Sequence, residues 1–273
     1  MKVSIILPTK NNKKTIKKCL ESICKQTYKN IEVIFVDNFS DDDTYEIAES
    51  FKNKIDIKLF KKWPERNLQR PFWASKASWE IYYFIDSDMY LEEKLIWEAV
   101  KLIEKNKEIW AIIVPEENII YNSFWSKVKA FERSLYNWDD KVEAARIFKK
   151  EVYNEIWWYN IELISWEDWD LSDRVREKNK TDRIKSKVKH DEWEVKIIEL
   201  LKKKFYYWEK FTIYSKNNWI KQAWSKIFYL RKSFYTNYKK YLKNPILFIW
   251  MFIMLNLTIL FFWVWYIKWK LKK

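Results

Sequence analysis

The sequence predicts an α/β fold with a mostly parallel sheet flanked by helices, and three observations support this prediction. Short apolar runs alternate with amphipathic stretches roughly every 20 to 30 residues. Several apolar runs end in Pro-Thr or Asp, side chains suited to the ligand-binding edge of a parallel sheet. A chain of 273 residues is also long enough for one such domain plus an appendage.

The individual elements follow from the spacing of apolar residues. Apolar runs of strand length predict strands over Val3–Leu7, Ile31–Val36, Ile55–Leu59, Ile81–Ile85 and Ala111–Val114. Helical spacing predicts helices over Lys13–Lys25, Thr44–Phe51, Phe72–Ser78, Glu92–Asn106, Glu151–Ile156, Trp166–Lys178 and Ile197–Tyr207. Strands and helices that alternate in this way form a parallel sheet covered on both faces.

The composition is unusual because the chain has no glycine and 19 tryptophans. Glycine is normally about 7% of residues, so its complete absence by chance has a probability of order one in a hundred million or less. Trp157 and Trp158 follow a predicted helix, where a left-handed glycine cap is common, and Trp79 precedes a strand. The hypothesis is that most tryptophans stand for glycine, with UGA translated as tryptophan. Positions such as Trp125 and Trp169 are exceptions where tryptophan itself is plausible.

Charge and cysteine content narrow the cellular setting. The net charge of +14 suits an anionic membrane surface, acidic substrates or nucleic acid. Cys19 and Cys24 are five residues apart on one predicted helix and point to different sides of it, so a bridge between them is not expected. Unpaired cysteines are typical of a reducing compartment. The N-terminus enters a strand at once and shows no signal peptide.

The C-terminal part predicts membrane attachment. Residues 245–267 carry no charge, and a stretch of this length can cross a hydrocarbon core of roughly 30 Å. A basic tail, 268–273, follows, and a basic aromatic juxtamembrane segment, 211–244, precedes it. Basic and aromatic residues next to a span favour contact with anionic lipid headgroups. Stacking on single-stranded nucleic acid is the rival interpretation of that segment, and we expect no nucleic-acid partner.

Candidate ligand-binding residues fall at the carboxyl ends of the predicted strands. Thr9 and Asp37 end the first two strands, and Asp86 and Asp88 follow a third. Mg²⁺ is commonly held by one or two carboxylates together with substrate phosphates. Each of these residues alone is weak evidence, since solvated loop acids and helix caps are common. Together, on separate strand ends of one sheet, they predict a site for a nucleotide diphosphate.

Linked motifs give the chain a resemblance to family 2 glycosyltransferases over roughly residues 1–210. The motifs are Val3–Thr9, Gln26–Ile34, Val36–Thr44, Pro64–Arg70, Ala77–Ile81, Phe84–Met89 and Ser165–Leu171. Such enzymes usually have glycine where this chain has Trp63, Trp73, Trp79, Trp157, Trp158 and Trp166. The resemblance implies a GT-A fold for residues 1–210, which would bind the nucleotide sugar. The basic helices and the one transmembrane helix expected from the composition would follow this domain.

The resemblance also implies roles for individual residues. In donor binding, Asp37 would contact the base or ribose beside Pro8 and Thr9, Asp86 would face ribose and metal, and Arg66 and Arg70 would hold phosphate. Asp88 would ligate Mn²⁺ or Mg²⁺, with Asp86 and His190 as the other metal ligands. In the Glu167–Asp168 pair, the family pattern favours Asp168 as the general base of an inverting transfer. An acidic first turn that complements the helix dipole is the alternative for this pair, and a structural histidine is the alternative for His190.

The expected function is therefore metal-dependent, inverting transfer of a sugar from a UDP- or GDP-sugar to an acceptor hydroxyl. The acceptor is expected to be lipid-linked or a glycan of the cell envelope. The catalytic domain is expected in the cytoplasm, at the cell membrane. A non-catalytic membrane scaffold on the same fold is one alternative. A nucleotidyltransferase is another, although no glycine-rich phosphate loop follows the first strand.

Overall fold

The computed structural model describes most of the chain, which divides into two compact units. The described residues are 1–62, 80–140, 142–156, 159–160, 167–178, 180–192, 194–203 and 231–271. Unit 1 comprises Met1–Glu116, Glu143–Glu162 and Glu167–Asp191. Unit 2 comprises Glu117–Val142, Leu163–Trp166 and Glu192–Lys273. Each unit is described by itself below.

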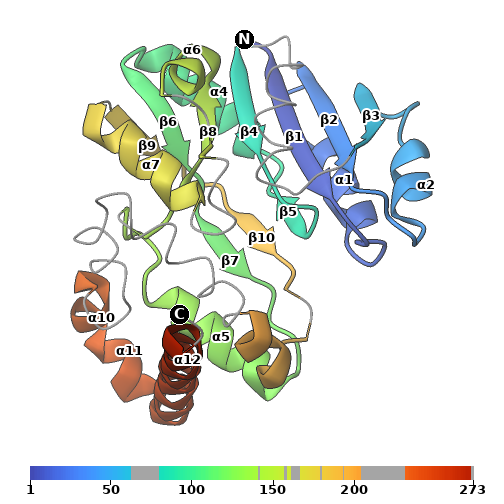
Figure 1. Cartoon of the computed structure of the whole chain (residues 1–273). Coiled ribbons are helices and arrows are strands. Elements are labelled where there is room, and N and C mark those ends of the chain that lie inside the picture. The colour runs from blue at the N-terminus through green and yellow to red at the C-terminus, as the bar shows by residue number, and fades with distance from the viewer. Residues whose placement is uncertain are drawn as a thin grey trace. The chain divides into compact units, whose positions relative to one another are not determined.

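Unit 1 is built on a seven-stranded sheet with the order β3-β2-β1-β4-β8-β6-β9 (Figure 1). Its strands are β1 Val3–Thr9, β2 Ile31–Asp37, β3 Ile57–Lys61, β4 Ile81–Phe84, β6 Ile109–Ile113, β8 Ala145–Lys149 and β9 Lys180–Arg183. Every pairing is parallel except those of β8, which is antiparallel to both β4 and β6. The predicted mostly parallel α/β fold is confirmed.

The register of β1 brings three strand ends to one edge of this sheet. Thr9 at the end of β1 pairs with Asp37 at the end of β2, and Ile6 pairs with Phe84 at the end of β4. The residues that follow these three strands therefore emerge side by side. This is the edge at which parallel sheets bind ligands.

Helices cover both faces of the sheet. Alternate residues of β1 point to opposite faces of the sheet and so belong to different cores. Ile5 lies in the core that includes residues of α1 (Ile16–Cys24), α2 (Thr44–Glu49) and α4 (Leu95–Lys105). Ile6 packs with the other core, which includes residues of α6 (Lys150–Glu155) and α7 (Glu167–Lys178). Each fully buried Ile, Leu or Val contributes about 1.5–3 kcal/mol. Because side chains alternate between the two faces of each strand, the sheet packs against a layer of helices on each face.

Unit 1 also contains a short antiparallel pair beside the main sheet. Strand β5 (Met89–Leu91) pairs with β10 (Val188–His190), and His190 lies opposite Met89. Strand β7 (Glu116–Asn118) starts at the residue that ends the first segment of unit 1. The pairing carries His190 back to the chain that follows Asp88.

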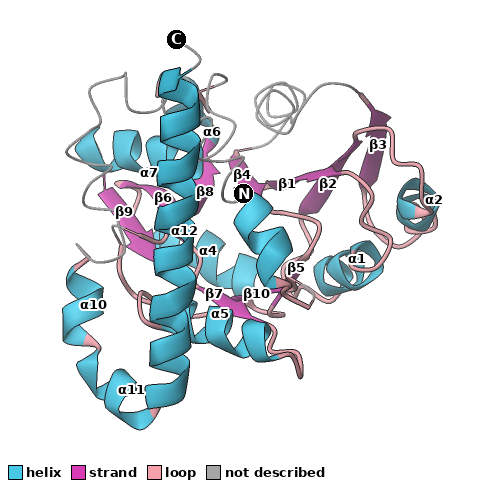
Figure 2. Ribbon diagram, turned by 60° about the horizontal axis from the view of Figure 1, so that its bottom comes forward, coloured by secondary structure: helices cyan, strands magenta, loops and turns pink. Residues whose placement is uncertain are grey.

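Apart from the end of β7, the described secondary structure of unit 2 is helical. Its helices are α5 (Phe124–Ser134), α10 (Lys232–Thr236), α11 (Tyr238–Lys243) and α12 (Pro245–Leu271), and residues 197–203 are also helical. Its core comprises the buried Val128, Phe131, Leu135, Met251 and Met254. Figure 2 shows α12 as one continuous helix. Much of α12 is apolar and exposed, including Ile246, Ile249, Phe252, Leu260 and Ile267.

Most predicted elements are present with shifted ends. The predicted helix Lys13–Lys25 is shorter, and the predicted strand Ile55–Leu59 begins two residues later. The predicted helix Phe72–Ser78 and the predicted domain boundary at residue 210 lie outside the described residues. Strands β5, β7, β8, β9 and β10 were not predicted. Within the described part of the chain, no helix is both long and apolar enough to cross a membrane, so a span over 245–267 stays a prediction of the sequence.

Three non-glycine residues of the described chain have a left-handed backbone. Asn11, Phe39 and Trp138 have φ angles of 51°, 48° and 72°. Asparagine tolerates this region, whereas a bulky aromatic residue is unfavourable there. Trp138 is also 61% exposed, so little burial of its ring offsets the unfavourable backbone. The tryptophans that the sequence analysis equates with family glycines, including Trp79 and Trp158, lie outside the described residues, and Trp138 was not among them.

Candidate active site

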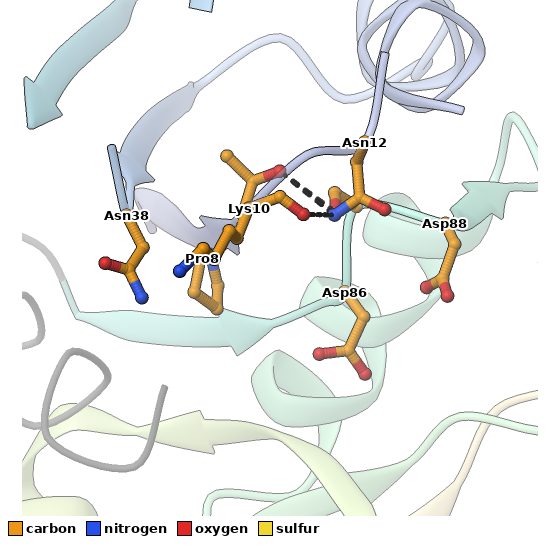
Figure 3. A pocket seen from close by; sticks show the side chains of 8 residues that line it. Pro8, Lys10, Asn12, Asn38, Asp86 and Asp88 are labelled. Atoms are coloured by element: carbon orange, nitrogen blue, oxygen red, sulfur yellow. Dashed lines mark hydrogen bonds between the residues drawn. The ribbon is translucent and has the colours of Figure 1, made fainter. Parts of the chain in front are cut away.

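A pocket of about 210 Å³ opens at the carboxyl ends of β1, β2 and β4 (Figure 3). The lining residues are Pro8, Thr9, Lys10, Asn12, Asn38, Asp86, Ser87 and Asp88. The structure thus brings together four of the predicted site residues: Pro8, Thr9, Asp86 and Asp88. Lys10, Asn12 and Asn38 were not predicted, because loop residues carry no periodic pattern that would single them out.

Short polar contacts fix the shape of the pocket. The Thr9 hydroxyl donates to Ser87 Oγ at 3.2 Å, which ties the end of β1 to the loop after β4. The Asn12 amide donates to Thr9 Oγ1 at 3.3 Å and to the Lys10 carbonyl at 2.9 Å (Figure 3). These bonds fix the chain after β1 on itself and on the loop after β4. The pocket is therefore largely pre-formed, as small-molecule sites usually are.

Asp86 and Asp88 flank Ser87, and their carboxylates are directed to the same side of the loop (Figure 3). The negative charge of these two carboxylates also acts on Cys19 of helix α1. Burial raises the pKa of the Cys19 thiol, and Asp88 and Asp86 raise it further. Asp88 Oδ1 is buried and has no hydrogen-bond partner among the described residues. An unsatisfied buried carboxylate oxygen is costly and indicates a missing cation or donor.

His190 lies beside Asp88. Its Nε2 atom is 3.4 Å from Asp88 Oδ2, and its side chain is only 14% exposed. The backbone N–H of the next residue, Asp191, donates to the Asp88 carbonyl at 2.7 Å. The histidine and the aspartate come from segments about a hundred residues apart, and the β5–β10 pairing brings them together.

Arg146 and Glu116 lie beneath the pocket, and the sequence analysis identified neither. Arg146 Nε donates to Glu116 Oε1 at 2.7 Å, and a terminal nitrogen donates to the same oxygen. Another terminal nitrogen is 3.8 Å from Asp86 Oδ2. Burial lowers the pKa of the Arg146 guanidinium, but Glu116, Asp86 and Asp168 outweigh burial and raise it. The strand Ala145–Lys149 carries two charged residues among five, so its sequence pattern does not single out Arg146.

Asp37 is fully buried but does not line the pocket. Its Oδ2 accepts a hydrogen bond from the Ser40 backbone N–H at 2.9 Å, and its Oδ1 accepts from the Ser40 hydroxyl. The carboxylate therefore shapes the loop after β2, and Asn38 from that loop lines the pocket instead. Its predicted contact with the base or ribose stays a prediction.

Glu167 and Asp168 begin α7. Glu167 is 3% exposed, whereas Asp168 is only partly buried and lies within electrostatic range of Arg146. Asp168 also anchors the helix, since its carbonyl accepts a hydrogen bond from Ser172 Oγ at 2.6 Å. The greater exposure of Asp168 makes it the better placed of the two carboxylates to meet a substrate. Arg66 and Arg70, predicted to hold phosphate, lie outside the described residues.

The residues present fit a metal ion bound together with a diphosphate. Among the described residues, no group of three His, Cys, Asp or Glu side chains is arranged as a ready metal cage, so the predicted set Asp86, Asp88 and His190 is not a closed one. Mg²⁺ and similar ions need only one or two carboxylates when substrate phosphates supply other ligands. The unsatisfied Asp88 Oδ1 offers such a ligand.

Comparison with known proteins identifies the family. Residues 4–164 match the sequence model of Glycosyl transferase family 2. The chain belongs to this family. It is similar to the poly(ribitol-phosphate) beta-N-acetylglucosaminyltransferase TarS of Staphylococcus aureus, at 33% identity over 113 residues. It is also similar to the UDP-Glc:alpha-D-GlcNAc-diphosphoundecaprenol beta-1,3-glucosyltransferase WfaP of Escherichia coli, at 35% identity over 106 residues.

The relatives are longer than the matched part of this chain. The TarS match covers 39% of this chain and 19% of TarS, and the WfaP match covers 38% of this chain and 42% of WfaP. Solved structures show the likeness of fold. TarS 1–349 in complex with UDP-GlcNAc has a TM-score of 0.57 at 20% identity, covering 77% of this chain and 66% of that one.

The mannosyltransferase PcManGT of Pyrobaculum calidifontis in complex with GDP-Man and Mn²⁺ has a TM-score of 0.63 at 15% identity. That match covers 94% of this chain and 85% of that one. The expected GT-A-like fold, a large and mostly parallel sheet flanked by helices, is therefore confirmed.

Proposed function

We propose that this chain transfers a sugar from a nucleotide-diphosphate donor to an acceptor hydroxyl, with inversion and with a divalent metal ion. The observation that carries the proposal is the pocket at the ends of β1, β2 and β4. It combines Asp86 and Asp88, including a buried carboxylate oxygen with no hydrogen-bond partner among the described residues. Family membership supports the same reaction class.

Each residue of the site has a distinct part in this chemistry. Asp88 and Asp86 would hold Mn²⁺ or Mg²⁺ with His190 beside them, and the bound ion would neutralise charge on the diphosphate leaving group. Asp168 takes the proton of the acceptor hydroxyl. The acceptor oxygen forms a bond to the anomeric carbon while the bond from that carbon to the diphosphate oxygen breaks. The nucleotide diphosphate leaves with the electron pair, and a single displacement inverts the anomeric centre.

The donor is proposed to be a UDP- or GDP-sugar and the acceptor a lipid-linked or glycan hydroxyl of the cell envelope. TarS and PcManGT were solved with UDP-GlcNAc and GDP-Man, and the name of WfaP specifies a diphosphoundecaprenol acceptor. Lys10, whose ammonium is a suitable partner for phosphate, lines the pocket. Arg66 and Arg70 are proposed to add further phosphate contacts.

Nucleotide release from a panel of UDP-, GDP- and dTDP-sugars tests the proposal, with Mn²⁺ present and then removed by EDTA. Water can replace the unknown acceptor in this assay. We expect release from one nucleotide class and its loss with EDTA. A folded protein that neither binds nor hydrolyses any donor would contradict the proposal and favour a non-catalytic scaffold.

We further propose that α12 anchors the protein in the cell membrane with unit 1 in the cytoplasm. Exposed apolar side chains occur along α12, and soluble monomers rarely expose large contiguous apolar patches. Exposed Lys232, Lys239 and Lys243 on the preceding helices suit anionic headgroups. The chain should resist carbonate extraction from membranes, whereas a version ending at Asn244 should be released. Carbonate release of the full chain would contradict membrane insertion.

We also propose that most tryptophans of this chain are glycines in the native protein. The left-handed backbone of the exposed Trp138 supports this, because glycine adopts that conformation without a steric penalty. Peptide mass spectrometry of the native protein should find glycine at Trp138, Trp79 and Trp158. Tryptophan at these three positions would refute the recoding. In the nucleotide-release assay, the version with glycine at the 19 positions is then expected to be the more active.

A further inference from the structure

Glu116 is held between a cation on one side and the imidazole of His190 on the other. Its Oε1 accepts two hydrogen bonds from Arg146, one of them from Nε at 2.7 Å. Its Oε2 is 3.6 Å from His190 Nδ1. Glu116 begins β7, Arg146 lies on β8 and His190 ends β10, so three separate strands meet in this contact. Neither Glu116 nor Arg146 has a part in the proposed chemistry above.

The hydrogen-bonding capacity of each group sets the orientation of the ring. An ionised carboxylate only accepts hydrogen bonds, so a neutral ring can direct its single N–H at Glu116 or at Asp88 but not at both. We consider the ring with its proton on Nδ1, facing the carboxylate that Arg146 already holds. In a neutral ring the other nitrogen, Nε2, then carries a lone pair. That nitrogen is 3.4 Å from Asp88 Oδ2, another electron-rich atom. Two electron-rich atoms at this separation attract only when a proton or a metal ion lies between them.

We propose that Glu116, clamped by Arg146, is a positioning residue that holds His190 with the Nε2 lone pair directed at Asp88. The inference rests on the proposed function, because it assigns the Asp88–His190 pair to the metal of that reaction. A ring nitrogen fixed in this way by a carboxylate on its far side is a recurrent support of metal-binding histidines. Arg146 has the matching task of fixing Glu116, and its contact with Asp86 joins Glu116 and Asp86 to the same guanidinium.

The isosteric substitution Glu116→Gln tests this arrangement. Glutamine has one acceptor oxygen and one donor amide group. Arg146 needs the oxygen, so the amide group turns to His190 Nδ1, which must then accept. The ring proton is forced to Nε2, facing Asp88. The tautomer should therefore flip in Glu116→Gln, whereas a residue that only neutralised Arg146 would leave it unchanged.

Because His190 is the only histidine of the chain, long-range ¹H–¹⁵N NMR of the full protein reports its tautomer without assignment. The expected result, without metal at pH 8, is a proton on Nδ1 alone in the wild type and on Nε2 in Glu116→Gln. Glu117→Gln is the matched control, since it removes the same charge from an exposed neighbour on the same strand. A wild-type ring with a proton on Nε2, or an unchanged tautomer in Glu116→Gln, would overturn the proposal.

Manganese affinity gives a second readout that needs neither donor nor turnover. Electron paramagnetic resonance of free Mn²⁺ should show binding weakened about 10- to 100-fold in Glu116→Gln and unchanged in Glu117→Gln. Arg146→Lys retains the charge but not the paired bonds, and should give an intermediate loss. Equal affinity in all variants would overturn the positioning role. The expected tautomers and affinities without nucleotide release would leave this inference standing and refute the proposed function instead.

Discussion

The two units of the chain build their buried ion pairs in different ways. In unit 1, Arg146–Glu116 and Arg183–Glu143 join segments that are 30 and 40 residues apart in sequence. Two further pairs of unit 1, Arg174–Asp170 and Arg176–Asp173, lie within helix α7. In unit 2 the buried pair Lys129–Glu132 joins neighbouring turns of one helix. The long-range pairs of unit 1 therefore exist only when the sheet has assembled, whereas the pair of unit 2 needs only helix α5.

The same contrast holds for apolar side chains. Unit 1 buries them in two cores on opposite faces of its sheet. Unit 2 has a smaller core in its described residues and leaves many apolar side chains of α12 exposed. In the described residues, unit 1 therefore buries most of its large apolar side chains, whereas α12 exposes many of its own.

Asp168→Asn should have the largest effect, because it removes the proposed general base from unit 1 without changing its size. We expect kcat to fall about 100- to 10,000-fold with donor affinity nearly unchanged. Steady-state kinetics with the donor found in the release assay measure both quantities. Asp182→Asn, at an exposed acid on β9, is the control. A drop in donor affinity with kcat retained would instead place Asp168 in donor binding.

Phe148→Ala tests how strongly the sheet core of unit 1 is packed. Phe148 is fully buried and contacts the rings of Phe84 and Tyr153. We expect the free energy of unfolding to fall by about 3–5 kcal/mol because a cavity forms. Ile249→Ala on α12, where the side chain is 55% exposed, should change it by less than about 0.5 kcal/mol. Urea unfolding in detergent compares the two variants, and similar losses would break the contrast between the units.

Asp88→Asn should reduce metal-dependent nucleotide release about 100-fold or more, because an amide is a weaker ligand for a hard cation than a carboxylate. Raising the Mn²⁺ concentration should recover part of the activity. The exposed Asp41→Asn, in the loop after β2, serves as the control. Undiminished release from Asp88→Asn with EDTA sensitivity intact would show that the metal binds elsewhere.

Charge removal on α11 should have the smallest effect. Lys239→Gln and Lys243→Gln, in a version ending at Asn244, should each weaken binding to anionic vesicles by about 1 kcal/mol, or roughly fivefold. Both lysines are exposed. Lys54→Gln in unit 1 should have no effect. Cosedimentation at several salt concentrations measures the affinity, and equal binding to neutral vesicles would rule out headgroup attraction.

The sequence sufficed to place the ligand-binding edge of the sheet. Apolar runs that end in Pro8-Thr9, in Asp37 and before Asp86 imply that these residues emerge together, and the register of β1 confirms it. The reason is that parallel strands share one carboxyl edge whatever the order of the strands. Pro8, Thr9, Asp86 and Asp88 could therefore be grouped without knowledge of the topology.

The contacts under the pocket could not be predicted in the same way. Arg146 reaches Asp86 only because β8 is inserted antiparallel beside β4, and a five-residue strand gives no indication of its neighbours. Glu116 meets His190 through two short strands with little pattern of their own. For Asp37 the sequence predicted the position at a strand end but not the contacts. Its hydrogen bonds to Ser40 depend on the geometry of the loop after β2, which has no sequence periodicity.

The place of β8 in the sheet also determines the order in which the chain can fold during synthesis. Strands β3, β2, β1 and β4 have one another as neighbours, so they can pair once residue 84 has left the ribosome. Strand β6 has only β8 and β9 beside it, and both emerge later. Until β8 arrives, β4 presents an open edge to other nascent chains. Protection of β4 from proteolysis in stalled nascent chains should therefore appear only after residue 149 is exposed.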